Sequence, residues 1–266
     1  MNATDLAIDV SHLVTHYGSR KILDDISFQA RQGEIMVIMG GSGSGKSTLL
    51  RHLLGLHQPT SGSIRLLGKD ITQLSAGEMY DLRKNMGVAF QGGALFNSMT
   101  VGENVELPLR EHTRLDENTM RIMSRMKLEV VNLAGFENLM PSELSGGMIK
   151  RAALARAIVM DPRLLFFDEP SAGLDPVVSA ELDELILILR DAMNMTIVVV
   201  THELESAFKI ADRITVLDQG RILMSDTVAA VRASTNERIQ SLLNRTPRNE
   251  VINPDEYLER LTREIF

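Results

Sequence analysis

Residues 40–48 read G-G-S-G-S-G-K-S-T and could bind the phosphate groups of a nucleotide. They fit the pattern G-x-x-x-x-G-K-[ST], in which glycines let successive backbone N–H groups point at one anion. Lys46 adds a charge that can reach the β- and γ-phosphates, and Ser47 offers a hydroxyl to Mg²⁺. The candidate phosphate-binding residues are Gly40, Gly41, Ser42, Gly43, Ser44, Gly45, Lys46, Ser47 and Thr48.

Two adjacent carboxylates, Asp168 and Glu169, follow the apolar run 164–167 (L-L-F-F). Adjacent carboxylates at the end of a buried strand are costly unless a cation lies near them. With a phosphate-binding loop in the same chain, that cation would be Mg²⁺. Asp168 would hold the ion through water, and Glu169 would act on the attacking water as general base. The alternative is a charged turn at the exit of a strand.

The phosphate-binding loop has a strand before it and a helix after it. Residues 34–39 (E-I-M-V-I-M) predict a buried strand, and leucines recur at helical spacing over residues 49–54. This order places the phosphates at the N-terminus of a helix, where the helix dipole favours negative charge. A flexible Gly/Ser linker, the alternative for this stretch, would not be bounded in this way.

Two further predicted strands end at polar residues. Gln91 follows residues 86–90 (M-G-V-A-F), and His202 follows residues 196–201 (T-I-V-V-V-T). Each is weak evidence alone, because most such glutamines are surface residues and a lone histidine is usually structural. Ligands of open α/β sheets bind at the carboxyl ends of the strands. The glycine loop, Gln91, the two carboxylates and His202 therefore predict a single site.

Two more candidates depend on their context. Ser145, Gly146 and Gly147 precede an alanine-rich helical stretch, so they predict an anion site at a helix N-terminus. In isolation, an ordinary serine N-cap followed by glycines is the better explanation of these residues. Tyr17 could stack on an adenine ring, but its position alone favours an aromatic side chain packed on the core.

The character of the chain changes between residues 92 and 160. Short strands are predicted in residues 6–38 and 62–67, and helical patterns follow from residue 92. In this insertion Ile122, Met126, Val130 and Leu133 share one helical face, which we expect to pack in the core. We expect one domain over residues 6–233, with a helical subdomain inserted over about 92–160.

The last residues, 234–266, predict a separate extension. Residues 244–253 are polar and hold Pro247, whereas Tyr257, Leu258, Leu261 and Ile265 share a face of a short helix. A helix this short is marginal alone. It would dock on its own domain or on another chain, and the extension is a candidate arm for docking a partner.

Composition and net charge limit the classes of protein to which the chain could belong. The chain has 266 residues, 44% of them hydrophobic, which suits one large domain or a core with a subdomain. Its net charge of −7 makes binding to nucleic acid an unfavourable hypothesis. The sequence has no cysteine, and its apolar runs are too short to span a membrane. A role at a membrane would therefore require a partner.

Taken together, these motifs resemble the nucleotide-binding subunit of an ABC transporter, over about residues 6–224. The resemblance implies an α/β fold: a RecA-like P-loop NTPase core with a parallel sheet, an N-terminal antiparallel β layer and an inserted α-helical subdomain. Tyr17 matches the adenine-stacking aromatic, and residues 40–48 match the Walker A loop. Gln91 resembles the Q-loop glutamine, which touches Mg²⁺ and senses the transmembrane partner.

The later motifs make the resemblance specific. Residues 144–148 (L-S-G-G-M) resemble the signature motif, although Met148 stands where many family members carry glutamine. Asp168 and Glu169 resemble the Walker B pair, Asp175 falls in the D-loop, and His202 matches the switch histidine. The resemblance implies ATP and Mg²⁺ as cofactors, with Ser47, Gln91 and Asp168 around the metal. It also implies a head-to-tail dimer, in which the signature motif of one copy caps the ATP of the other.

A narrower resemblance lies in residues 90–105, 107–113 and 139–151, which are similar to the ATPase of the Mla phospholipid-trafficking system among MCE-type ABC transporters. It implies a multi-pass permease, a substrate-binding MCE protein and a small STAS-domain protein as partners at the cytoplasmic face of the inner membrane. Phospholipid would be handled indirectly, to maintain the lipid asymmetry of the outer membrane. The alternatives are an ABC importer or exporter of another substrate, and a mechanical or soluble ABC ATPase.

Overall fold

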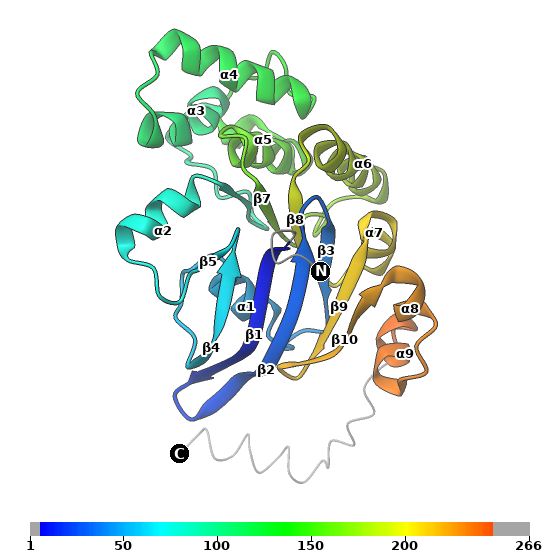
Figure 1. Ribbon diagram of the computed structural model, residues 1–266. Coiled ribbons are helices and arrows are strands. Elements are labelled where there is room, and N and C mark those ends of the chain that lie inside the picture. The colour runs from blue at the N-terminus through cyan, green and yellow to red at the C-terminus, as the bar shows by residue number, and fades with distance from the viewer. Residues whose placement is uncertain (1–5, 247–266) are drawn as a thin grey trace, which may run out of the picture. The chain divides into compact units, whose positions relative to one another are not determined.

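The chain divides into two compact units, Met1–Ala233 and Ser234–Phe266. The computed structural model describes residues 6–246 of it. The first unit is built on a six-stranded sheet in the order β10-β9-β3-β8-β7-β6 (Figure 1). Strands β9, β3, β8, β7 and β6 run parallel, and β10 pairs antiparallel with β9. The strands are β3 (Ile35–Met39), β6 (Met86–Ala89), β7 (Leu164–Asp168), β8 (Thr196–Thr201), β9 (Arg213–Asp218) and β10 (Arg221–Thr227).

A second, antiparallel sheet has the order β2-β1-β4-β5. Its strands are β1 (Leu6–Tyr17), β2 (Arg20–Arg31), β4 (Ser61–Leu66) and β5 (Lys69–Asp70). Helix α1 (Lys46–Leu53) contacts β2 and β4 of this sheet and β8 of the parallel sheet. A single cluster of buried apolar side chains joins α1 to both layers. Burial of leucines on two sides of α1 thus fixes the phosphate-binding loop between the sheets.

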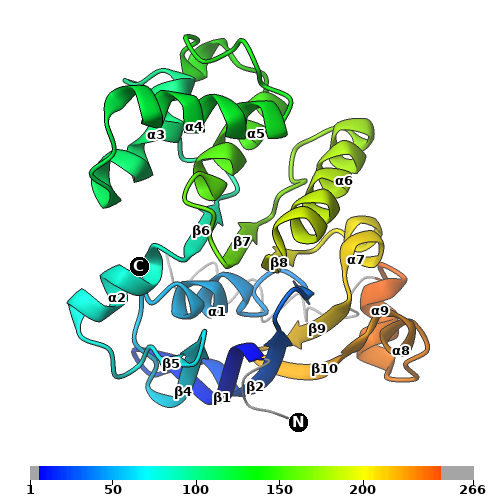
Figure 2. The same ribbon diagram turned by 45° about the horizontal axis from the view of Figure 1, so that its top comes forward.

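Helices surround the parallel sheet. Figure 2 shows α3 (Val101–His112), α4 (Glu117–Val130) and α5 (Gly146–Ile158) grouped beyond the edge formed by β6 and β7. A 3₁₀ turn, Pro141–Glu143, precedes α5. The remaining helices of this unit are α2 (Ala76–Arg83), α6 (Pro176–Met193), α7 (Leu204–Ile210) and α8 (Val228–Arg232). None of the helices among residues 6–246 is long and apolar enough to cross a bilayer.

The prediction for α4 is wrong. Its residues Ile122, Met126 and Val130 are 52%, 59% and 42% exposed, although Leu133 beyond the helix is buried. The buried row is instead the one that contains Met120, Ser124 and Leu128. Both rows repeat every four residues, and the hydroxyl of Ser124 made the buried row look polar. In the structure that hydroxyl donates to the carbonyl oxygen of Gly102, 3.3 Å away on α3, so its burial is satisfied.

The second unit contains α9 (Glu237–Leu243), and Asn236 precedes its first residue. The Oδ1 atom of Asn236 accepts hydrogen bonds from the backbone N–H groups of Arg238 and Ile239. This is a conventional N-cap. The final helix predicted around residues 257–265 lies outside the described residues.

Candidate active site

The phosphate-binding loop joins β3 to α1, and two of its glycines have left-handed backbones. Gly43 and Gly45 have φ angles of 74° and 105°, which L-residues with a Cβ rarely adopt. Gly40 is required for a different reason, because a Cβ there would lie 2.2 Å from the carbonyl oxygen of Leu217. The backbone N–H of Gly220 also donates to the carbonyl oxygen of Ser44 at 2.9 Å. The end of β9 and the turn after it therefore support the loop.

Lys46 is buried inside this loop. Its Nζ donates to the carbonyl oxygens of Gly40 at 2.8 Å and Gly41 at 3.1 Å. Burial lowers the pKa of this lysine, while the carboxylates of Glu169 and Asp168 act to raise it. These bonds go only to neutral carbonyls, and the buried hydroxyl of Ser44 has no hydrogen-bond partner among the described residues. The loop therefore fits phosphate oxygens. These would provide a negatively charged acceptor for the ammonium of Lys46 and a hydrogen-bond partner for the hydroxyl of Ser44.

The two carboxylates lie where β7 ends. Burial raises the pKa of Asp168, and the adjacent charge of Glu169 raises it further, whereas Arg51 and Lys46 act to lower it. A carboxylate with these neighbours is a suitable ligand for Mg²⁺, directly or through water, because the ion offsets the cost of its burial. Ser47 is the second residue of α1 and is exposed. Asp168 and Ser47 thus fit the metal-binding roles predicted for them.

Glu169 has a left-handed backbone, with φ of 50°. Its N–H donates to the carbonyl oxygen of Val200 at 2.8 Å. Its Oε2 accepts from the hydroxyl of Thr201 at 3.1 Å and lies 2.9 Å from Nδ1 of His202. The structure therefore brings the predicted base and the predicted switch histidine together at the ends of neighbouring strands.

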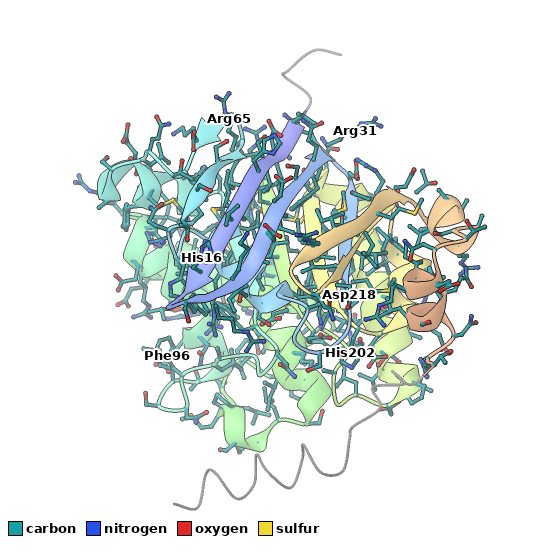
Figure 3. The ribbon with its side chains drawn as sticks, turned by 90° about the horizontal axis from the view of Figure 1, so that it is seen from below. His16, Arg31, Arg65, Phe96, His202 and Asp218 are labelled. Carbon is teal, nitrogen blue, oxygen red and sulfur yellow. The ribbon has the colours of Figure 1, made fainter. Side chains whose placement is uncertain are left out.

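Tyr17 ends β1 and is 44% exposed, so the expectation from position alone that it packs on the core is wrong. Its ring lies edge-on to that of His57, with centroids 6.2 Å apart. The hairpin that carries it lies beside the loop, because a Cβ on Gly45 would meet Leu23 of β2 at 2.7 Å. Figure 3 shows His16 toward the same end of the molecule as His202 and Asp218. The ring of Tyr17 is thus free to stack on a base bound near the loop.

The signature residues and Asp175 come close together within this chain. Ser145 caps α5, and its Oγ accepts from the N–H of Met148 at 3.3 Å. Asp175 caps α6, and its Oδ1 accepts from the N–H of Val178 at 3.1 Å. A Cβ on Gly147 would lie 2.9 Å from Cγ1 of Val178. Gly146 begins α5 with open space around it, as a site for an outside anion requires.

Gln91 follows β6 and is exposed. Sequence reasoning missed Lys150, whose Nζ donates to the carbonyl oxygens of Pro170 and Ala172, both at 2.6 Å. Burial lowers the pKa of Lys150, while Glu169 and Glu203 act to raise it. The only signal in the sequence was a lysine near the start of an otherwise alanine-rich helix.

This geometry agrees with comparisons to known proteins. The family described as "ABC transporter" matches residues 23–172. The chain belongs to the ABC transporter family. Together with the loop and the two carboxylates, membership makes it an ATPase of the ABC type, with the α/β fold and the family resemblance predicted from sequence both confirmed.

Two relatives align over most of the chain. It is 44% identical to the "Intermembrane phospholipid transport system ATP-binding protein MlaF" of Haemophilus influenzae, covering 89% of both chains. It is 41% identical to the "Probable ribonucleotide transport ATP-binding protein mkl" of Mycobacterium leprae, covering 90% of this chain and 69% of that protein. Among solved structures, the dimeric post-hydrolysis state of the ATP-binding cassette MJ0796 bound to ADP and Pi matches with a TM-score of 0.77. That match has 30% identity and covers 83% of this chain and 98% of the other.

Proposed function

We propose that this ABC ATPase drives phospholipid transport between the inner and outer membranes and so maintains the lipid asymmetry of the outer membrane. The observation that supports this most is the 44% identity to a phospholipid transport ATPase over 89% of both chains. The mycobacterial relative named for ribonucleotide transport supports the alternative of another substrate. It is the weaker guide, because this chain spans only 69% of its length.

Hydrolysis would use residues at the carboxyl ends of four strands, β3, β6, β7 and β8. Lys46 would turn from the carbonyl oxygens of its own loop to the β- and γ-phosphates of ATP. Glu169 would take the proton of the attacking water, held in place by Thr201 and His202. Ser47, Gln91 and Asp168 would hold Mg²⁺, whose charge would offset the negative charge of the phosphates.

The active form would be a head-to-tail dimer. Ser145, Gly146 and Gly147 lie at the start of α5, where backbone N–H groups can face an anion. In the dimer they would cap the γ-phosphate held by the second copy, and loss of that phosphate would release the two copies. The dimeric state of the related MJ0796 cassette supports this arrangement.

A groove suits a helix of a multi-pass permease. It has a volume of about 480 Å³ and lies between the residues around Leu54 and those of α3. Exposed Phe90 and Phe96 line it together with Leu107, and Arg83, Lys84 and Arg156 add positive charge. Phe96 is labelled in Figure 3. An amphipathic helix with acidic residues would bury its apolar face there.

Such a permease would hold the ATPase at the cytoplasmic face of the inner membrane, as a peripheral subunit. The same proposal includes an MCE substrate-binding protein and a small STAS-domain protein as further partners. The C-terminal extension from about residue 244 is a candidate docking arm for the small partner or for a second copy.

Affinity purification from solubilised membranes, followed by mass spectrometry, tests this proposal. We expect a multi-pass permease, an MCE protein and bound phospholipid. Phe96→Glu should reduce recovery of the permease, because it places a charge in the apolar groove, whereas the exposed Ile188→Glu on α6 should not. Recovery of a different permease would reject the lipid assignment, and recovery of soluble partners alone would reject the transporter.

A further inference from the structure

Lys150 of α5 holds the segment that follows the catalytic carboxylate. Its ammonium donates to the carbonyl oxygens of Pro170 and Ala172, both at 2.6 Å, and lies 3.4 Å from that of Glu169. An ammonium has three N–H donors, and three carbonyl groups of one short segment converge on it. The carbonyl groups of the main chain at and after Glu169 are therefore held by one side chain, Lys150 of α5.

This segment needs support on both sides. Glu169 has φ of 50°, a conformation that is unfavourable for a residue with a Cβ. Its N–H is bound to the carbonyl oxygen of Val200 on β8, which fixes the start of the segment. Lys150 fixes the carbonyl side. Without the ammonium, three carbonyl groups would lose a donor, and the backbone of Glu169 could relax toward a more favourable φ.

The helix that carries Lys150 also begins with the signature residues. Ser145 caps that helix, and Gly147 packs so closely against Val178 that a Cβ would approach to 2.9 Å. Next along the helix, Arg151 is bound to Glu181 of α6, with Nη2 2.6 Å from Oε2. The start of α5 is thus tied both to α6 and to the segment after Glu169.

We propose that Lys150 is a positioning residue for hydrolysis, which sets the place of Glu169 and ties it to the signature turn of the same copy. The inference rests on the head-to-tail dimer proposed above. In that dimer the signature turn faces the ATP of the partner, whereas Glu169 acts on the ATP of its own loop. Lys150 then links the two ATP sites, because a shift of α5 toward the partner's phosphate moves the carbonyl groups beside Glu169.

A double-mutant cycle on the full-length protein tests this role. Lys150→Met removes the donors and keeps the length of the side chain. We expect it to lower kcat by about 10- to 100-fold, as small displacements of a catalytic group do, while the Kd for ATP changes by less than about twofold. In the Glu169→Gln background it should have no further effect on the residual rate, because it acts through that carboxylate. Lys150→Arg should recover part of the rate.

Lys127→Met is the matched control, since it removes a lysine of α4 that is bound to Asp161, with Nζ 2.5 Å from Oδ1. It should leave kcat unchanged. Equal losses of rate from Lys150→Met in both backgrounds, or a weaker Kd for ATP with unchanged kcat, would overturn the inference. The Lys150→Met, Glu169→Gln double variant should still dimerise with ATP on size exclusion, and failure to do so would show that Lys150 only supports the signature turn. An unsubstituted protein that neither hydrolyses ATP nor dimerises would contradict the proposed function itself, and the inference with it.

Discussion

The imidazole of His202 and the carboxylate of Glu169 lie in contact, with Nδ1 2.9 Å from Oε2. They leave neighbouring parallel strands, β7 and β8, whose ladder ends with Asp168 beside Val200. The same carboxylate accepts from the hydroxyl of Thr201. The orientation of the proposed general base is therefore set by the end of β8, and substrate binding does not have to create it.

Glu169→Gln should separate binding from hydrolysis. The amide oxygen can still accept from Thr201, so the local structure should persist, but the amide cannot take a proton from water. We expect kcat to fall by about 10²- to 10⁴-fold, with ATP binding retained and a dimer trapped in the presence of ATP. Phosphate release and size exclusion measure the two effects. Full hydrolysis by this variant in its complete assembly would remove Glu169 from the mechanism.

Lys46→Ala should weaken nucleotide binding. The ammonium is the buried cation of the loop, and it donates to the carbonyl oxygens of Gly40 and Gly41. Since a charge-assisted bond contributes about 1.5–3 kcal/mol, the Kd for ATP should rise by about 10- to 100-fold. Isothermal titration calorimetry measures this change. Lys21→Ala, which removes an exposed lysine bound to Asp24, should leave the Kd unaltered, and a similar Kd for both variants would contradict the role of Lys46.

The requirement for Mg²⁺ should grow as the pH falls. Burial and the charge of Glu169 raise the pKa of Asp168, so its proton competes with the metal at a higher pH than for an ordinary aspartate. The ionised form, which binds Mg²⁺, dominates above the raised pKa and is lost as the pH falls through it. Mg²⁺ titrations of ATPase activity at several pH values, corrected for the protonation of free ATP, measure this effect. An Mg²⁺ requirement that stays constant down to the ordinary range of an aspartate would contradict it.

Gly40→Ala and Gly43→Ala should differ sharply. A Cβ on Gly40 would lie 2.2 Å from a backbone oxygen of β9. A Cβ on Gly43 would lie in open space, so alanine there would be destabilised by its φ angle of 74° and not by a clash. We expect Gly43→Ala to lower the free energy of unfolding by about 1–2 kcal/mol, and Gly40→Ala to lower it by more. Urea unfolding measures both values. Equal losses would show that β9 does not support the loop.

Much of the site was predictable from sequence because parallel strands place their carboxyl ends together. Glu169 and His202 could be assigned to one site from the residue pattern, since each follows a buried strand. Lys150 could not, because its bonds go to main-chain carbonyl groups, which carry no signature in the sequence. The exposure of Tyr17 was not predicted either, since the position of an aromatic residue in a strand favours packing on the core.

The buried face of α4 was mispredicted for a related reason. Two rows of the helix have the same spacing, and the one that holds Ser124 looks polar although it is buried. Ile122 and Met126 therefore seemed the better core residues. Which row is buried depends on the neighbouring helix α3, where the carbonyl oxygen of Gly102 accepts from Ser124.

The exposed row gives a test of this correction. Ile122 is 52% exposed, so Ile122→Ser should change the free energy of unfolding by less than about 0.5 kcal/mol. Leu128 lies on the same helix and is fully buried, so Leu128→Ala should lower that free energy by about 2–5 kcal/mol. Urea unfolding of both variants measures the difference. A large loss for Ile122→Ser would mean that this face is covered, because removing an apolar side chain from water-exposed surface cannot cost so much.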